Sequence, residues 1–285
     1  MTPPAPVATP GHPVSPLALT YLGVAGWQLT HAGNTLLLDP YFTRAAVTDS
    51  SRPLLPDAAA IARFAPPTAD VILVGHSHYD HLLDVPTIAL RTSATVVGTA
   101  STLNVARAAG VPEARLQLAV PGRALTLQNF SVRPLASLHS LIGIPSVEIP
   151  RDVRLPLAAK DYGEGGTLAY EVGVGGRSLV FFDTANFDEA ALRALHPGLH
   201  PDVAVIATGL REKVPDYTCR LMRLLGNPPV VFPTHFDAHW QPLTGKETRL
   251  TDEQRADLAK FEREVHACSP ATRVVIPEAF RPYPV

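Results

Sequence analysis

The sequence predicts a mixed α/β fold in which two sheets carry helices on their outer faces. Short apolar segments alternate with turn residues, and strand-like and helix-like segments follow one another in two successive batches. No repeat of solenoid length occurs. We therefore expect one domain over residues 17–285. It is preceded by a proline-rich, poorly ordered leader over residues 1–16.

The first half of the chain contains four predicted strands and three predicted helices. The run 71–74, Val-Ile-Leu-Val, is continuously apolar, as in a strand buried on both faces. A short helix should begin at Asp84, with Asp84 as its cap and Pro86 in its first turn. The other strands are expected at 17–22, 28–31 and 35–38, and the other helices at 57–64 and 101–109.

The second half repeats the alternation of strands and helices. A glycine-rich turn at 173–176 predicts a hairpin between two of its strands. Strands are expected at 131–135, 167–174, 178–182, 203–207, 230–232 and 273–276, and helices at 189–195, 218–225 and 252 to about 265.

The composition excludes several classes of protein. With 46% hydrophobic and 18% charged residues and a net charge of −2, the chain resembles an ordinary soluble globular protein, and no nucleic-acid partner is expected. No apolar run reaches the roughly 18 residues of a membrane helix. We expect a cytoplasmic location, or a periplasmic one if an export signal precedes this sequence. The composition does not predict the oligomeric state.

The two cysteines are far apart in the sequence. Cys219 and Cys268 form no CxxC pair, which excludes a structural zinc knuckle. A disulfide is not expected in a domain of this size, so we interpret them as two ordinary buried thiols.

One short run concentrates residues that bind metals. It follows the buried strand 71–74 and comes before the helix at Asp84, so it lies in a strand-to-helix loop. Three imidazoles and one carboxylate within six residues suit borderline divalent metals, with zinc as the first choice and Mn²⁺ or Fe²⁺ as alternatives. The alternative interpretation is a solvated polar loop. The run is His76-Ser77-His78-Tyr79-Asp80-His81.

Three further residues of the same chemical kind come just after predicted strands. They are His139, Asp183 and His235. Because such loops share one rim of the sheets, we expect these side chains to complete a site with the histidine run. Taken alone, Asp183 could simply cap a turn, and each histidine could be structural.

The histidine run and the three later residues resemble the ligand pattern of the metallo-β-lactamase superfamily. This resemblance extends over nearly the whole chain from about Leu17. The opening segment, from Thr20-Tyr21-Leu22 through Leu38-Asp39-Pro40, is also similar. The likeness is strongest to the branch of ascorbate-phosphate lactonase-like and phospholipase-D-like hydrolases. This resemblance implies a four-layer αβ/βα sandwich of two mixed sheets, with helices outside and the site at the sheet edges.

The resemblance also implies a dinuclear centre. His76, His78 and His139 would hold the first ion, while Asp80, His81 and His235 would hold the second. Asp183 would bridge the two ions. Asp39 matches a buried carboxylate that steadies the histidine loop, although an Asp-Pro turn explains it equally well.

Two ions that share a carboxylate can also share a water, whose pKa falls from about 15.7 toward ~7. The expected function is hydrolysis of an ester, lactone or amide-like bond by a metal-bridging hydroxide, with Asp80 orienting the nucleophile and carrying a proton. The alternatives are a metal-dependent phosphodiesterase or phospholipase and a non-catalytic, metal-stabilised binding protein. Di-iron redox relatives carry Glu at the position of His78, which disfavours redox chemistry here.

The sequence is less informative about the substrate, which we expect to be a small molecule. Trp27, Tyr79 and His239 lie next to the motifs and could line the cleft, as could Trp240, although both tryptophans suit a core equally well. The irregular segment 143–166 is a candidate substrate-covering loop. Its basic residues Arg151, Arg154 and Lys160, like Arg211 and Lys213 further on, could hold a phosphate or simply be solvated.

Overall fold

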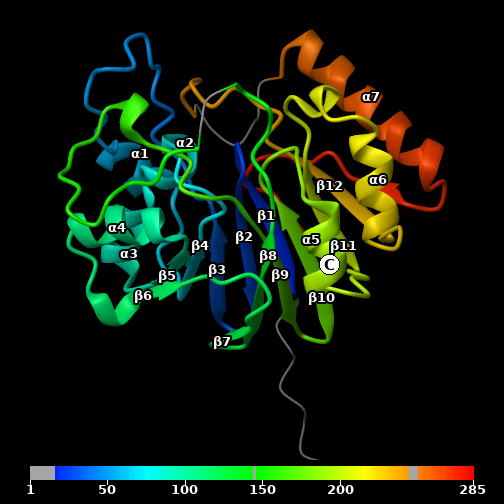
Figure 1. Ribbon diagram of the computed structural model, residues 1–285, viewed down its shortest axis with the longest axis horizontal. Helices are drawn as coiled ribbons and strands as arrows, with labels where there is room; N and C mark the ends of the chain where they lie inside the picture. The colour runs from blue at the N-terminus through cyan, green and yellow to red at the C-terminus, as the bar shows by residue number, and fades with distance from the viewer. Residues whose placement is uncertain (1–16, 144–145, 244–249) are drawn as a thin grey trace, which may run out of the picture.

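Two sheets lie face to face in the middle of the molecule, and helices cover their outer sides (Figure 1). In this computed structural model, residues 17–143, 146–243 and 250–285 are described, and within them each sheet has seven strands. The layers run helix, sheet, sheet, helix. The predicted four-layer αβ/βα sandwich is therefore confirmed. The predicted leader, residues 1–16, lies outside the described residues.

The first sheet combines an antiparallel meander with a parallel half. Strands β1 to β3 pair antiparallel, and β3 to β6 pair parallel. All residues of β4 are buried, as its continuous apolar run predicted. The order is β14(Pro282–Pro284), β1(Ala18–Gly23), β2(Gly26–His31), β3(Asn34–Leu38), β4(Val71–Leu73), β5(Thr95–Gly98) and β6(Leu116–Leu118).

The second sheet has the same mixed character. Strands β7 to β10 pair antiparallel, whereas β10 to β13 pair parallel. The order is β13(Arg273–Val274), β12(Val230–Thr234), β11(Val203–Ala207), β10(Arg177–Phe182), β9(Leu168–Val174), β8(Phe130–Ala136) and β7(Leu125–Leu127).

Three apolar clusters hold the layers together. One lies between the sheets and includes Leu29 and Leu36 from the first sheet and Val172 and Val205 from the second. The other two join each sheet to its own helices. Because apolar side chains on both faces of each sheet leave water, burial stabilises the sheet pair and the helix layers together.

The helices divide between the two outer layers (Figure 1). The first layer contains α1(Ala58–Phe64), α2(Tyr79–Leu82), α3(Val85–Thr92) and α4(Ala100–Ala108), and the second contains α5(Glu189–Leu195), α6(Tyr217–Leu224) and α7(Asp252–Cys268). Single turns of 3₁₀ helix occur at η1(Glu113–Arg115), η2(Ala159–Asp161) and η3(Arg211–Lys213). Helix α7 begins with a capping box of Thr251 and Gln254.

Asp84 occupies the N-cap position of α3, as predicted. Asp84 precedes α3, but its side chain makes no cap hydrogen bond. Its carboxylate instead accepts hydrogen bonds from the backbone N–H groups of Phe42, at 2.6 Å, and Thr43, at 2.8 Å. The buried Asp84 therefore fastens the segment after β3 to the start of α3, a tertiary contact that local sequence does not reveal.

Strands β5, β6, β7 and β14 were not predicted. Each has only three or four residues, and β14 consists of Pro282, Tyr283 and Pro284. Such segments lack a periodic pattern long enough to identify, and they become strands because a neighbouring strand pairs with them. Helix α2 is likewise a single turn within the histidine run.

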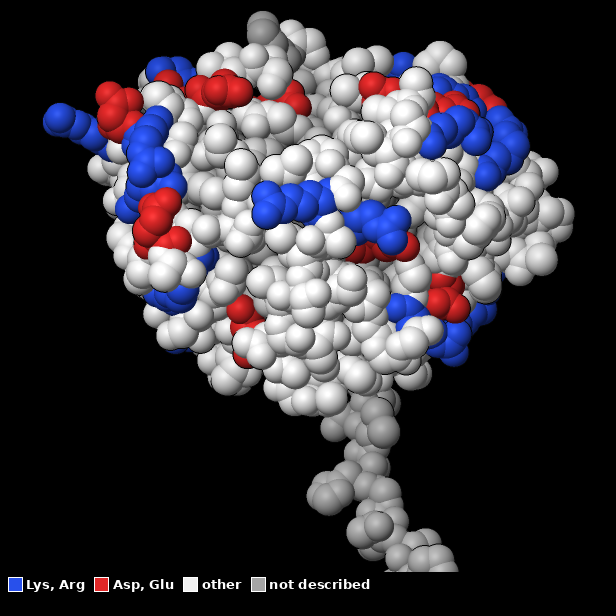
Figure 2. Space-filling view, turned by 60° about the horizontal axis from the view of Figure 1, so that its bottom comes forward, with Lys and Arg blue, Asp and Glu red and all other residues white. Residues whose placement is uncertain are grey.

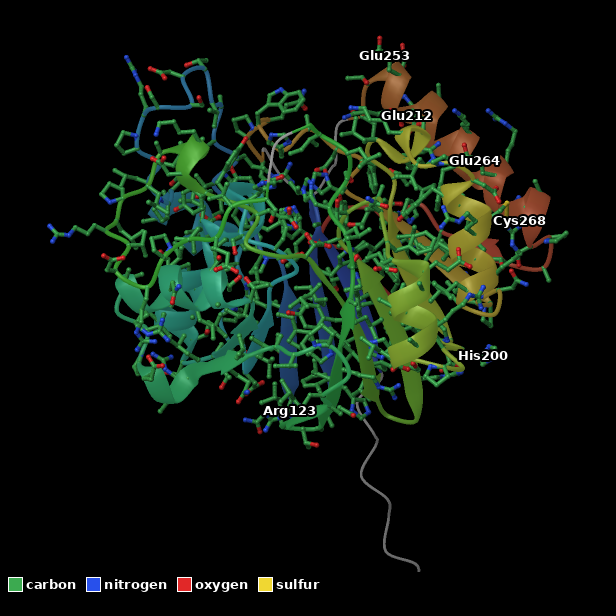
Figure 3. All side chains as sticks on the ribbon, viewed as in Figure 1. Arg123, His200, Glu212, Glu253, Glu264 and Cys268 are labelled. Atoms are coloured by element: carbon green, nitrogen blue, oxygen red, sulfur yellow. A yellow bond between two sulfur atoms is a disulfide. The ribbon has the colours of Figure 1, made fainter. Side chains whose placement is uncertain are left out.

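The interpretation of the cysteines as free thiols is wrong, because Cys219 and Cys268 form a disulfide. Cys219 lies in α6 and Cys268 ends α7, where Figure 3 labels it. The packing of α6 against α7 places their Cα atoms 5.6 Å apart although 49 positions separate them in the sequence. Sequence spacing does not reveal this pairing of helices.

The surface shown in Figure 2 carries charges of both signs in small mixed groups between uncharged areas. No large patch of one sign covers this face. Among the described helices, none is both long enough and apolar enough to cross a bilayer.

Candidate metal centre

The candidate site lies where strands of both sheets end. In the second sheet, Phe182 of β10 pairs with Ile206 of β11, and Ala207 of β11 pairs with Thr234 of β12. Asp183 and His235 come immediately after β10 and β12. Because the carboxyl ends of parallel strands meet at one edge, the register places these side chains on the same rim.

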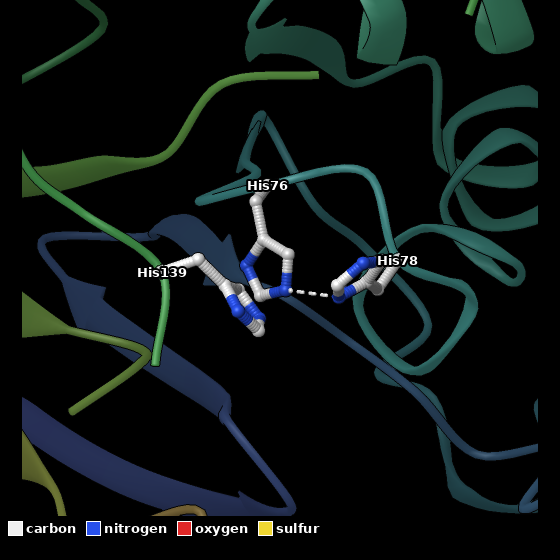
Figure 4. A group of neighbouring side chains, drawn as sticks. All are labelled: His76, His78 and His139. Atoms are coloured by element: carbon white, nitrogen blue, oxygen red, sulfur yellow. Dashed lines mark hydrogen bonds between the residues drawn. The ribbon is translucent and has the colours of Figure 1, made fainter. Parts of the chain in front are cut away.

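Three imidazoles from two loops converge at this rim (Figure 4). His76 and His78 lie on the loop after β4, and His139 lies on the loop after β8. His76 Nε2 is 3.1 Å from His78 Nδ1, and the ring centre of His139 lies 4.6 Å from that of His76 and 4.7 Å from that of His78. One ligand atom from each of the three residues lies within 4.8 Å of the other two, close enough for all three to bind one metal ion. These three residues are called the first cluster.

Hydrogen bonds determine which ring nitrogen is free in the first cluster. His76 Nδ1 lies 2.7 Å from Asp183 Oδ2, and His139 Nδ1 lies 2.8 Å from the carbonyl oxygen of Ser140. These acceptors favour a proton on Nδ1, which leaves the Nε2 lone pair of both rings for a ligand. The Asn186 side chain also donates to the His139 carbonyl at 3.0 Å, which fastens this loop to the loop after β10.

Asp80, His81 and His235 form the second cluster. Asp80 Oδ2 lies 3.4 Å from His235 Nε2 and 3.8 Å from His81 Nε2, so these three atoms are close enough to bind a second metal ion. The single turn of α2 brings Asp80 and His81 round together.

The backbone that carries His235 is strained. His235 has a φ of 55°, a left-handed value that is uncommon for a residue other than glycine, and its N–H donates to the Val24 carbonyl at 2.7 Å. The surrounding structure therefore holds this side chain in place at an energetic cost.

Asp183 contacts a histidine of each cluster. In His76, however, it faces Nδ1, whereas the other ring nitrogen, Nε2, faces His78. Its Oδ2 contacts His76 Nδ1 and lies 3.5 Å from His81 Nδ1, so it touches one histidine of each cluster. It groups with His76 and His81, not with His78, His139 or His235. The bridging role implied by the resemblance therefore stays a prediction, and it requires this carboxylate to rotate.

Asp39 lies below the histidine loop. Its Oδ1 accepts a hydrogen bond from the Gly75 N–H at 2.8 Å, and its Oδ2 lies 3.2 Å from His81 Nδ1. This position allows Asp39 to orient His81 and to fasten the start of the loop to the end of β3. The other interpretation, a simple Asp-Pro turn, does not account for these contacts.

Burial controls the charge state of the imidazoles in the first cluster, whereas the pKa of His235 in the second is raised because Asp80 outweighs its burial. Burial, together with His81 and His78 nearby, holds the pKa of His76 well below its usual range, and burial with His139 lowers the pKa of His78 to about 4. Burial opposes ionisation of Asp80, but His81 and His235 outweigh it and keep the pKa of Asp80 well below its usual range. At neutral pH the first cluster thus offers neutral imidazoles and the second an ionised carboxylate, which are the forms that bind cations.

The residues present fit divalent cations. Asp183 Oδ1 is buried and has no hydrogen-bond partner within the described residues, which is costly unless a cation or a water satisfies it. Five histidines and two carboxylates in this arrangement offer nitrogen and oxygen ligands of the kind that zinc and its neighbours accept. The resemblance and the geometry thus point to the same donor set.

The structure separates the three residues expected beside the substrate. Trp27 is 1% exposed, and its ring N–H donates to Thr234 Oγ1 at 2.9 Å, which fits the alternative expectation of a core position. It lines a small pocket together with Asp39, Gly75 and Asp183, and its role beside the substrate stays a prediction. It belongs to the apolar core beneath the site. Tyr79 and His239 lie together, with Tyr79 Oη 3.1 Å from His239 Nε2. Trp240, 53% exposed, has its ring centre 4.8 Å from that of His239.

Two features of the site escaped the sequence analysis. Arg44 and Asp237 form a buried ion pair at 3.0 Å, and Asp237 also accepts hydrogen bonds from the Tyr21 hydroxyl and the Val24 N–H. This pair anchors the loop that carries His235. The second feature is Glu164, which lies beside the histidine loop. Its only sequence signal is an acidic residue among glycines just before a buried strand.

Replacing His139 by alanine should weaken binding of the first ion by more than about 100-fold, because even the outer partners of metal ligands contribute 10- to 100-fold. Metal analysis of the purified variant, with zinc titration against a competing chelator, measures this loss. His200→Ala is the matched control, because His200 is an exposed histidine far from the site in Figure 3. Equal zinc affinity in the two variants would remove His139 from the centre.

Comparisons with known proteins identify the family of this chain. A family model described as a beta-lactamase superfamily domain matches residues 34–236. A UPF0173 metal-dependent hydrolase of Polynucleobacter asymbioticus is 27% identical over 234 residues, which cover 79% of this chain and 75% of that protein. A protein of the same description from Methanopyrus kandleri is 26% identical over 268 residues, covering 94% of this chain and 99% of that one.

Among solved structures, the chain is similar to Igni18, a metallo hydrolase of Ignicoccus hospitalis. The TM-score is 0.64 at 18% identity, and the match covers 94% of this chain and 98% of Igni18. At this identity the likeness supports the fold alone.

Proposed function

The chain belongs to the beta-lactamase superfamily domain family and is a metal-dependent hydrolase, and from this premise we propose that it cleaves an ester, lactone or amide-like bond with two divalent ions. The observation that carries the proposal is the pair of three-residue clusters at one rim of the sandwich. They share one loop, because His78 of the first cluster and Asp80 of the second are two residues apart. Two ions held by these clusters would therefore act on the same small-molecule substrate.

The assignment of ligands follows the clusters. We propose that His76, His78 and His139 hold one ion, that Asp80, His81 and His235 hold the other, and that Asp183 joins them. Zinc is the first choice for both positions, with Mn²⁺ and Fe²⁺ as alternatives. When bound, divalent ions supply Lewis acidity and make a water acidic enough to act as a nucleophile at neutral pH.

Side chains of this protein would orient the metal ligands and transfer the proton of the attacking water. Both close contacts of Asp80, with His81 and His235, use Oδ2. Its Oδ1 can therefore take a proton from the attacking water and return it to the leaving group. Asp39, which accepts from the Gly75 N–H and lies 3.2 Å from His81 Nδ1, steadies the loop that carries ligands of both clusters.

Metal analysis followed by a substrate panel tests the proposal. The purified protein should contain about two divalent ions per chain, and it should hydrolyse 4-nitrophenyl esters or lactones faster than bis(4-nitrophenyl) phosphate. Removal of the metal by a chelator should abolish turnover, and zinc or manganese should restore it. Two bound ions without metal-dependent turnover of any of these compounds would favour the binding-protein alternative.

A further inference from the structure

The segment 39–44, which directly follows β3, contacts both loops that carry ligands of the second cluster. Its first residue, Asp39, has its Oδ2 3.2 Å from His81 Nδ1 in the loop after β4. Its last residue, Arg44, has its Nη2 3.0 Å from Asp237 Oδ2 in the loop after β12. One short segment therefore joins the two loops from which the three ligands of the second cluster come.

The ion pair between Arg44 and Asp237 is buried. The two side chains are 2% and 6% exposed. The other terminal nitrogen of Arg44, Nη1, donates to the Ala238 carbonyl at 2.9 Å. Because both nitrogens are engaged within the protein, this guanidinium acts on the loop after β12 and not on a substrate.

Asp237 transmits this contact to the backbone beside His235. Its Oδ1 accepts hydrogen bonds from the Val24 N–H and the Tyr21 hydroxyl, both at 2.8 Å. The Val24 carbonyl in turn accepts from the His235 N–H at 2.7 Å. His235 and Asp237 are thus held on the same turn between β1 and β2, and Arg44 holds Asp237 from the other side.

The backbone is left-handed at both ends of this connection. The φ angle is 48° at Arg44 and 55° at His235, values that are uncommon for residues other than glycine. Such conformations persist only where the surrounding contacts determine them. Loss of the ion pair should therefore let the loop relax and carry the His235 imidazole away from Asp80 and His81.

Gly23 leaves the space that the guanidinium fills. A Cβ atom built on Gly23 would overlap Arg44 Nη2 and would lie 3.3 Å from Asp237 Oδ2. An alanine at this position would therefore displace the guanidinium while every charged residue stays in the chain.

We propose that Arg44 is a positioning residue for the second metal ion. Its ion pair with Asp237 holds His235 where the three ligands of the second cluster can bind one cation. The inference rests on the proposed function, because it presupposes that ion. Within the described part of the chain, the side-chain hydrogen bonds and ion pairs of Arg44 reach only Asp237 and Ala238, so binding at the first cluster should not depend on Arg44.

Zinc titration against a competing chelator, carried out in two backgrounds, tests this inference. His139→Ala lacks a ligand of the first cluster and Asp80→Ala lacks one of the second, so each background reports on the other cluster. Adding Arg44→Met to His139→Ala should weaken zinc binding about 10- to 100-fold, the range for residues that orient metal ligands. Adding it to Asp80→Ala should leave zinc binding within about twofold. A general loss of stability would not produce this difference between the backgrounds.

Gly23→Ala is a second variant, which breaks the ion pair without deleting a charge. Gly33→Ala is its matched control, because Gly33 also has a positive φ, 82° against 97° at Gly23, but a Cβ there would meet no described atom within 4 Å. In the His139→Ala background, Gly23→Ala should weaken zinc binding as Arg44→Met does, and Gly33→Ala should not. Arg52→Met controls for the lost charge, since the Arg52 side chain is 81% exposed.

The outcomes distinguish this inference from the proposed hydrolysis. Unchanged zinc binding on adding Arg44→Met to His139→Ala, or an equal loss in both backgrounds, would overturn the positioning role and leave hydrolysis intact. If Arg44→Met did not fold, the comparison of Gly23→Ala with Gly33→Ala would decide in the same way. A background that bound no zinc would show that the clusters do not bind separately, which also contradicts the inference. Failure of every ester and lactone to react would overturn hydrolysis, while the titrations would still decide the role of Arg44.

Discussion

Replacing Asp80 by alanine should lower kcat for the best ester of the panel by at least about 10³-fold, because the variant loses both a ligand of the second cluster and the group that transfers the proton. Its contacts with His81 and His235 make Asp80 the centre of that cluster, whereas the first cluster does not include it. The variant should therefore keep about one ion per chain. Steady-state kinetics and metal analysis measure the two effects separately.

Asp152→Ala is the matched control, since Asp152 is an exposed carboxylate on the segment 143–166. It should retain native kcat and both ions. Turnover of Asp80→Ala within tenfold of the native value would refute its role as ligand and proton carrier. Loss of both ions would instead show that the two clusters bind metal as one unit.

Replacing both Cys219 and Cys268 by alanine should lower the free energy of unfolding by about 4 kcal/mol, because the disulfide closes a long loop in the unfolded chain. The 49 positions between the cysteines set this magnitude. The corresponding decrease in Tm is about 10 °C for a chain of this size. Urea denaturation followed by circular dichroism measures the loss, and the metal content of the folded variant should be unchanged.

The reduced native protein is the internal control for this prediction. A reductant should lower the stability of the native chain to that of the double variant and should not affect the double variant itself. If the native protein were equally stable with and without reductant, the predicted contribution would be wrong.

The segment 143–166 shows how far local sequence patterns can be interpreted. Its irregular composition predicted a substrate-covering loop, and residues 144–145 of it are not described. The described part is fastened to the body of the protein: Asn104 donates to the Ile149 carbonyl at 2.9 Å, and the Ile149 N–H donates to Ser101 Oγ at 2.9 Å. Its buried residues Ile149 and Tyr162 join the core beside the first sheet. The role in substrate covering stays a prediction, and Glu164 is the residue through which this segment reaches the site.

The sequence by itself determined the layers and the nucleus of the site. Both depend on local information: strand and helix periodicity decides which segments are buried, and six consecutive residues from His76 to His81 already contain four ligand-type side chains. The positions of His139, Asp183 and His235 just after strands followed from the same local pattern, because strand ends determine which residues reach a common rim.

Only the tertiary structure decided which of these residues meet and what surrounds them. It placed Asp183 against His76 and His81, buried Trp27 against Thr234, paired Cys219 with Cys268 and joined the Glu164 carbonyl to Ser77 of the histidine loop. Each of these contacts joins positions that are distant in the sequence. They depend on the order of strands in a sheet and on how one helix packs against another, and no local pattern of residue types encodes either.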